Sequence, residues 1–235
     1  MILKYIIPSK IKLQLKLCLR YFGGLKYDFA CRKEENKNFG FSISTLQEIK
    51  KGKFFENKMH NIITASKRIE NITIYPNQVF SFWRIIGNPN TKNTFKVGRN
   101  IINGKVSEEK AGGICQLSSI LYITSLKANL KIIERHNHSV DIYTEEERFT
   151  PLGADATVVY GSKDLIFQNN FDFPIRFNFV FNSNYITCHL KSLNPIMEAE
   201  VEFRRDYLED KILVHTLVNK EIKYQSSYKI ISPEH

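Results

Sequence analysis

A pair of adjacent glycines, Gly112 and Gly113, leads directly into an apolar, helix-forming stretch from Leu117 to Leu130. Paired glycines permit a tight backbone turn, so we expect the chain to turn here and then begin a helix. Cys115 lies at this junction, where the first N–H groups of a helix are unpaired and carry partial positive charge. Because that environment makes a thiol easier to ionise, the sequence predicts that Cys115 is a nucleophile.

Two histidines follow about twenty residues later, in the run from Glu134 to Ser139. Residues 131–143 alternate with period two and predict a strand on which His136 and His138 share the inward face with apolar residues. Arg135 would then lie on the opposite face, either solvated or in contact with an anionic substrate. An imidazole close to Cys115 would complete a cysteine nucleophile.

Helical patterns come early in the chain and strand patterns come late. Apolar residues recur at helical spacing over 54–70, which predicts an amphipathic helix. Val79–Trp83 is interpreted as an aromatic strand or packing segment. Short strands are expected at 72–74, 155–160, 164–167, 175–181, 185–190, 198–203 and 222–231. This order predicts an α+β fold, an antiparallel sheet with helices packed on one side and a helical N-terminal extension.

Composition divides the chain into a basic N-terminal extension, residues 1–52, and an α+β domain, residues 53–235. Residues 11–22 alternate between apolar and basic side chains. Such a segment could make peripheral contact with an anionic membrane, or it could pack on the domain as a plain helix. No run approaches the length of a membrane span, and no secretion signal is evident. We therefore expect a cytoplasmic or peripheral membrane protein, with export by an unrecognised route left open.

The formal net charge of +10 favours anionic partners, yet the basic excess lies mostly between Lys4 and Lys53. It lacks the mixture of arginines and aromatic residues expected of a nucleic-acid face, so no nucleic-acid partner is predicted. The four cysteines are scattered without a CxxC pair, which argues against a disulfide framework or a structural zinc knuckle. Cys188 and Cys18 are expected to be buried and inert, and no cofactor is predicted.

Five motifs occur in order along the chain: the segments 71–82, 112–119, 134–139, 155–161 and 164–169. Together they resemble the VanW family, over roughly residues 40–192. Where that family usually has Pro-Gly-Glu, this chain has Pro76-Asn77-Gln78. The difference falls in a turn.

The resemblance implies an activity on bacterial cell walls. VanW-type domains in some cell-wall proteins act as L,D-transpeptidases that form 3-3 peptidoglycan cross-links through the cysteine of a G-x-C-Q motif, and the matching residue here is Cys115. The partner would be a peptidoglycan stem peptide or precursor, in peptidoglycan remodelling or glycopeptide resistance.

Candidate roles for neighbouring residues follow from that chemistry. His136 or His138 would be the general base and later the acid, with the other histidine or Ser139 orienting the ring. Asp155 could hold the imidazole tautomer. Backbone N–H groups from Gly113 to Cys115 would bind the oxyanion. The remaining candidate substrate contacts are Gly112, Gln116, Arg135 and Tyr160; Gln116 could instead be an ordinary first-turn residue and Tyr160 a core residue.

Three other interpretations remain open at this point. Cys115 could be a small apolar residue packed at a helix start, and the histidines a hydrogen-bonded pair in the core. Cys115, His136 and His138 could supply three zinc ligands. The chain could also be a non-catalytic accessory protein that binds a peptidoglycan precursor or a partner.

Overall fold

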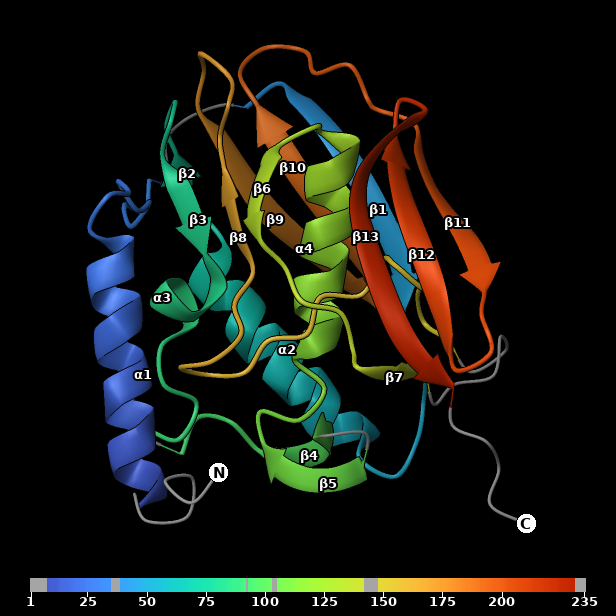
Figure 1. Cartoon of the computed structure of the whole chain (residues 1–235). Helices are drawn as coiled ribbons and strands as arrows, with labels where there is room; N and C mark the ends of the chain where they lie inside the picture. Colours follow the sequence, from blue (N-terminus) through green and yellow to red (C-terminus); the bar gives the residue numbers. More distant parts are fainter. Residues whose placement is uncertain (1–7, 35–38, 92, 103–104, 142–147, 231–235) are drawn as a thin grey trace.

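A four-stranded sheet has the strand order β1-β10-β9-β2 and is antiparallel throughout. Its strands are β1 (Phe41–Glu48), β10 (Tyr185–Ser192), β9 (Ile175–Asn182) and β2 (Thr73–Ile74). On β10, every second side chain is fully buried, namely Ile186, Cys188 and Leu190. The computed structural model describes residues 8–34, 39–91, 93–102, 105–141 and 148–230 (Figure 1).

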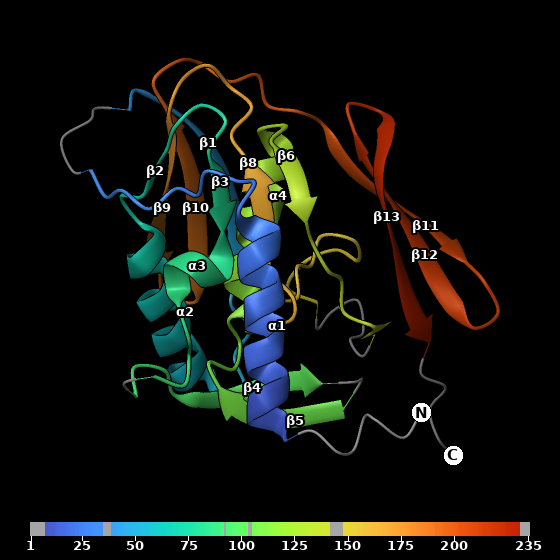
Figure 2. The ribbon, with the colours of Figure 1, turned by 60° about the vertical axis from the view of Figure 1, so that its left-hand side comes forward.

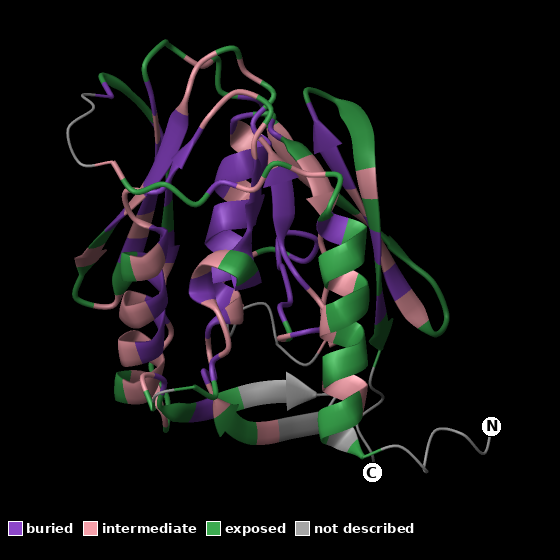
Figure 3. Ribbon diagram, turned by 90° about the vertical axis from the view of Figure 1, so that its left-hand side faces the viewer, coloured by how far each residue is buried: buried purple, intermediate pink, exposed green. Residues whose placement is uncertain are grey.

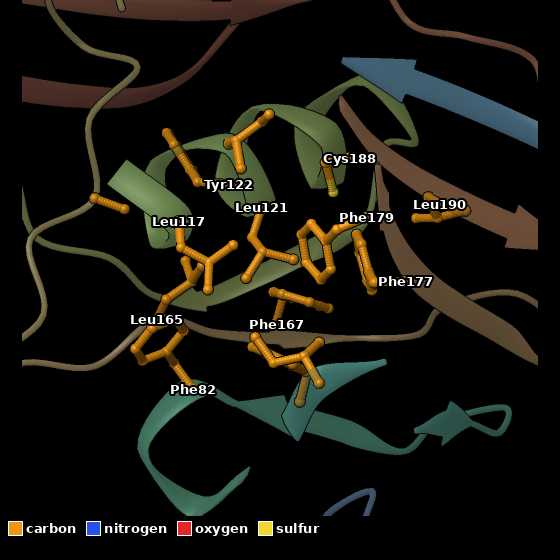
Figure 4. Packing of buried hydrophobic residues seen from close by; sticks show 14 of the residues in the cluster. Phe82, Leu117, Leu121, Tyr122, Leu165, Phe167, Phe177, Phe179, Cys188 and Leu190 are labelled. Atoms are coloured by element: carbon orange, nitrogen blue, oxygen red, sulfur yellow. The ribbon is translucent and has the colours of Figure 1, made fainter. Parts of the chain in front are cut away.

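Two helices pack against this sheet, α2 (Phe55–Ile69) and α4 (Cys115–Lys127). α4 runs through the middle of the molecule and is buried along nearly its whole length. Leu117 and Leu121 on one side of α4 point into a cluster of aromatic rings that includes Phe167 and Phe177 (Figure 4). Burial of each such leucine contributes about 1.5–3 kcal/mol, so the helix that carries Cys115 is firmly anchored.

A second, three-stranded sheet has the order β3-β8-β6, with β3 (Val79–Ser81), β8 (Ile166–Gln168) and β6 (Lys131–Glu134). Helix α3 (Phe82–Ile86) follows β3 directly, and the side chain of Ser81 caps it by accepting a hydrogen bond from the N–H of Arg84. The hairpin of β4 (Val97–Ile102) and β5 (Lys105–Lys110) lies beside the start of α4.

The C-terminal residues form a separate sheet on the side of α4 away from α1 (Figures 1 and 2). Its order is β11-β12-β13-β7, with β11 (Val201–Tyr207), β12 (Lys211–Val218), β13 (Glu221–Ile230) and β7 (Val140–Asp141). The first three strands form an antiparallel meander, whereas β7 pairs with β13 in parallel. β7 is the segment that follows the two histidines, so this sheet is joined to the region of the candidate site.

The α+β class expected from the sequence is confirmed, but several predicted elements differ. The strand expected at 131–143 is interrupted, because residues 135–139 have no strand pairing between β6 and β7. Residues 155–160 do not form the expected strand either. Some of their backbone groups bond to side chains of other elements: the N–H of Ala156 to Ser119 and the carbonyl of Asp155 to Arg135. The N–H of Thr157 bonds the backbone carbonyl of His136 instead.

Four strands were not expected, β1, β4, β5 and β12. β1 falls inside the range 1–52 that composition assigned to the extension, yet all eight of its residues pair with β10. Its buried side chains, Ile43, Thr45 and Gln47, include two polar ones, which hides the alternation that normally reveals a strand.

Helix α1 (Ser9–Gly24) lies on the surface, and most of its residues are exposed or only partly buried (Figure 3). Leu13 and Leu17 face the body of the molecule at Gly161, whereas Ile11, Leu15 and Leu19 are exposed. Cys18 is also exposed, so the expectation that it is buried was wrong. Among the described helices, none is long and apolar enough to cross a membrane. Peripheral contact with an anionic membrane stays a prediction.

Candidate active site

The turn before α4 depends on a close backbone contact. A Cβ atom on Gly112 would lie 2.1 Å from the backbone carbonyl carbon of Gly98 on β4, so no other residue fits there. Gly113 has φ = +86°, a left-handed conformation that glycine adopts without strain. The buried side chain of Asn61 on α2 donates a hydrogen bond of 3.0 Å to the carbonyl of Gly112. The glycine pair therefore fixes the approach of the chain to Cys115.

Cys115 is the first residue of α4, and its thiol is only partly buried. Its Sγ lies 3.8 Å from the carbonyl oxygen of Val158. The N–H of Ile114 is bonded to Ala111, but within the described part of the chain the N–H groups of Gly113 and Cys115 have no partner. Two unpaired donors beside the sulfur are available for a developing oxyanion.

His138 joins Cys115 to a buried carboxylate. Its Nδ1 lies 2.6 Å from Oδ2 of Asp155, and its backbone N–H donates to the same oxygen at 2.7 Å. The His138 side chain also interacts with the Cys115 thiol, and this interaction favours the charged imidazole. Because Nδ1 is engaged by Asp155, Nε2 is the nitrogen left to face the thiol. Cysteine, histidine and aspartate thus stand in the order of a nucleophile, a base and the group that orients the base.

Charges in this cluster stabilise one another. Burial disfavours a charge on His138, but the hydrogen bonds to Asp155 and Cys115 outweigh it and raise the pKa of the imidazole to about 10. Burial also disfavours the Asp155 carboxylate, yet the hydrogen bond from His138 and the charge of Arg135 hold its pKa well below the usual range. At neutral pH His138 is therefore an imidazolium between a carboxylate and a thiol.

Arg135 is buried, so the expectation that it is solvated was wrong. Its side chain is 7% exposed, and Nη2 lies 3.0 Å from Oδ1 of Asp155. The guanidinium also donates to the carbonyls of Asp155 and Gly153. The charge of Arg135 is therefore paired with the buried Asp155 carboxylate, and a contact with an anionic substrate stays a prediction.

The C-terminal sheet completes this network. The hydroxyl of Tyr228 on β13 donates to Oδ1 of Asp155, and Ser226 accepts a hydrogen bond from Arg135. Neither residue was singled out from the sequence. No local pattern could have found them, because they follow Asp155 by about seventy residues and lie on a strand of mixed composition.

His136 belongs to a different cluster from His138. Its Nε2 lies 2.9 Å from Oε1 of Glu134, and Glu134 forms a salt bridge of 2.9 Å with Arg20 of α1. The two rings were expected on one strand face, but the chain leaves the strand after Glu134 and the period of two no longer applies. The structure therefore brings His138, and not His136, to Cys115.

Two serines after Cys115 hold the segment that carries Asp155. Ser118 Oγ donates to the carbonyl of Ala156 at 2.5 Å, and Ser119 Oγ accepts from the N–H of Ala156 at 2.9 Å. From the sequence these serines were recognised only as part of a motif. A signal was present, because two adjacent serines in an otherwise apolar helix need hydrogen-bond partners when buried.

The remaining candidates lie at the margins of the site. Gln116 is buried and its amide donates to the carbonyl of Glu48 at 2.6 Å, so it ties α4 to β1. Ser139 is exposed, and its carbonyl accepts from the N–H of Lys229. Tyr160 packs edge-on against Trp83 with ring centroids 5.6 Å apart. The sequence left open whether Ser139 or the second histidine orients the imidazole. In the structure it is Asp155 that contacts the ring of His138.

Tyr160 and Trp83 border a pocket of about 610 Å³ between α1 and the body of the molecule. A much smaller cavity of about 30 Å³ lies directly beside His138 and Asp155, with Phe149 in its wall.

Among the residues that the structure describes, no group of three His, Cys, Asp or Glu side chains could hold a metal ion. The two histidines that a zinc site would need point to different partners.

The Arg135–Asp155 pair predicts a large effect on stability. Replacing Arg135 with Met should lower the free energy of unfolding by about 3–5 kcal/mol, because it leaves a buried carboxylate with one cationic partner fewer. Urea denaturation would measure the change. Arg204→Met is the matched control: its ion pair with Glu202 is largely exposed and should cost less than about 1 kcal/mol. Equal losses in the two variants would contradict the assignment.

The network of His138, Asp155 and Arg135 also makes the stability of the fold depend on pH. The pKa of Asp155 is lowered by folding, so its contribution to stability is present above about pH 4 and is lost as the pH falls further. The pKa of His138 is raised, so its contribution is full below about pH 6.5 and is lost as the pH rises toward 10. The contributions of Asp155 and His138 to the stability of the fold are therefore both full between about pH 4 and pH 6.5.

Comparisons with known proteins identify the family of this chain. The family described as "VanW like protein" matches residues 57–191. The chain is 37% identical over 120 residues to "Uncharacterized protein YoaR" of Bacillus subtilis (strain 168), covering 51% of this chain and 38% of that protein.

A second relative is "Vancomycin B-type resistance protein VanW" of Enterococcus faecalis (strain ATCC 700802 / V583), 28% identical over 186 residues, covering 72% of this chain and 63% of that protein. The chain thus spans less than two thirds of the length of either relative. No solved structure matches it. Because the family match includes Cys115, His138 and Asp155 and extends over more than half of the sequence, this chain belongs to the VanW family.

Proposed function

We propose that this protein is a cysteine-dependent acyl transferase acting on cell-wall stem peptides, in the manner of an L,D-transpeptidase. The observation that supports it best is the chain of contacts from Cys115 through His138 to Asp155. An imidazolium beside a cysteine stabilises the thiolate, which is the attacking form. One relative is named a vancomycin B-type resistance protein, which supports a role in peptidoglycan remodelling or glycopeptide resistance.

The reaction begins when the Cys115 thiolate attacks the carbonyl carbon of the L,D peptide bond in a stem tetrapeptide. A C–S bond forms, and the negative oxygen is held by the N–H groups of Gly113 and Cys115. The C–N bond then breaks, and D-alanine leaves with the proton that His138 donates. The product is a thioester on Cys115.

The second half restores the enzyme. An amine from a neighbouring stem peptide attacks the thioester, and His138 accepts a proton from it. The new C–N bond forms the cross-link, the C–S bond breaks, and Cys115 returns as a thiolate beside the imidazolium. Asp155 stays ionised throughout and keeps the ring in the orientation that both steps need.

A trapping experiment tests the proposal directly. The protein is incubated with tetrapeptide-bearing peptidoglycan fragments without an acceptor amine, and intact mass spectrometry follows the thioester. We expect a tripeptide adduct on Cys115 with stoichiometric release of D-alanine. In parallel, iodoacetamide near neutral pH should label Cys115 ahead of Cys188, whose burial raises its pKa to about 12.

Two outcomes would contradict the proposal that this protein is an acyl transferase. Binding of the fragments without any adduct would favour a non-catalytic accessory protein. Slow labelling of Cys115, at a rate no greater than that of the exposed Cys18 and Cys31, would remove the activated thiolate on which the mechanism depends.

A further inference from the structure

Lys58 of α2 lies against the glycine turn that presents Cys115. A Cβ on Gly113 would be 2.5 Å from Lys58 Cγ and 3.2 Å from Cδ, so the lysine stem covers the turn directly. The Nζ lies 5.8 Å from the centre of the Phe149 ring. Phe149 in turn borders the small cavity whose wall includes His138 and Asp155. The stem and the ammonium of Lys58 therefore lie between the turn before Cys115 and the residues around its base.

The Lys58 ammonium lies in a positively charged environment. Among the described residues, no carboxylate lies within ion-pair distance of it, and Arg99 of β4 adds a second positive charge nearby. Burial and the charge of Arg99 lower the pKa of Lys58 to about 8, so the ammonium still predominates at pH 7. Keeping a partly buried cation next to another cation costs free energy, which an incoming anion would recover.

We propose that Lys58 binds the carboxylate of the residue that leaves from the substrate, so that it selects donor peptides with a free C-terminus. This inference rests on the proposed function. In that reaction the leaving D-alanine carries a carboxylate one Cα away from the bond that breaks. A cation close to the Gly113–Cys115 turn meets that carboxylate while the carbonyl carbon lies over the sulfur. A donor whose terminal carboxylate is amidated would lose this contact.

Iodoacetate and iodoacetamide provide a test that needs no peptide. Both alkylate a thiolate by forming a C–S bond and releasing iodide, and they differ only in a carboxylate against an amide. The quantity measured is the ratio of the two alkylation rates at Cys115, at pH 7, in the full chain. We expect Lys58→Met to lower this ratio about tenfold, since it removes one charge–charge attraction from a partly buried site.

Two further variants make the result specific. Lys58→Arg keeps the charge and should keep most of the ratio. Lys67→Met removes an exposed lysine from the last turn of the same helix, roughly 14 Å along its axis, and should leave the ratio unchanged. Circular dichroism and thermal unfolding of each variant show that the fold is retained.

The outcomes separate the two proposals. If Cys115 reacts rapidly but its ratio is the same in the wild type and Lys58→Met, the carboxylate contact is overturned while the acyl transferase stands. An equal drop in Lys67→Met would also overturn it, since it would reflect net charge alone. If Cys115 reacts slowly with both reagents in the wild type, the acyl transferase fails, and the role of Lys58 fails with it.

Discussion

Replacing Cys115 with Ala is expected to abolish the formation of 3-3 cross-links on tetrapeptide-bearing fragments, together with the release of D-alanine. The thiolate is the only group in the proposed reaction that forms a bond to the substrate, so no partial activity should remain. The fold should persist, because Cys115 is only partly buried and the helix is anchored by Leu117 and Leu121. Chromatographic separation and mass spectrometry of the products would measure the loss.

Cys188→Ala is the matched control. Its thiol is fully buried on β10 and its pKa is raised to about 12, so the substitution should reduce stability slightly and leave cross-linking intact. Cross-linking that persists in Cys115→Ala, or that disappears equally in both variants, would discard the proposed mechanism.

The second large effect separates the two histidines. His138→Ala should lower kcat/KM by about 10²–10⁴-fold, since it removes the group that transfers protons in both halves of the reaction. His136→Ala should change kcat/KM by no more than a few-fold, because its ring is bonded to Glu134 rather than to Cys115. Comparable losses in the two variants would show that the site is not built as described.

The pH dependence of the wild type offers an independent check on His138. The imidazolium supplies the proton to the leaving amine, so the rate of acylation should fall as the pH rises through about 10. Thiolate alkylation by iodoacetamide needs no such proton and should not fall over the same range. The different slopes of the two profiles would identify His138 as the acid.

The local part of the site could be predicted from the sequence, because it depends on short-range rules. Gly112 and Gly113 predicted a turn, and the apolar run after Cys115 predicted a helix. In the structure the turn leads into α4. Asp155 was proposed only because its motif lay close by in sequence, and the structure brings it to His138. The sequence could not decide which histidine faces the thiol, because the alternation with period two places His136 and His138 on the same face of the predicted strand.

What failed has a common physical origin in long-range hydrogen bonding. Arg135 looked solvated because a strand period assigned it to the outer face, but the period ends at Glu134 and the guanidinium turns inward to Asp155. The segment that holds Asp155 looked like a strand, yet its backbone groups bond to Ser118, Ser119 and Arg135 instead of a neighbouring strand. Pairings of this kind leave no periodic trace in the sequence.

The bonds from Tyr228 and Ser226 to the Asp155–Arg135 pair have a practical consequence for anyone who shortens this protein. The family match ends at residue 191, but β13, which carries both hydroxyls, begins at Glu221. A fragment trimmed to the matched segment would expose one side of the charged cluster to water, and would remove the hydrogen bond from Tyr228 to the carboxylate and the one from the guanidinium to Ser226. The smallest fragment that keeps the contacts of Asp155 and Arg135 therefore extends to the end of β13, well past the end of the family match.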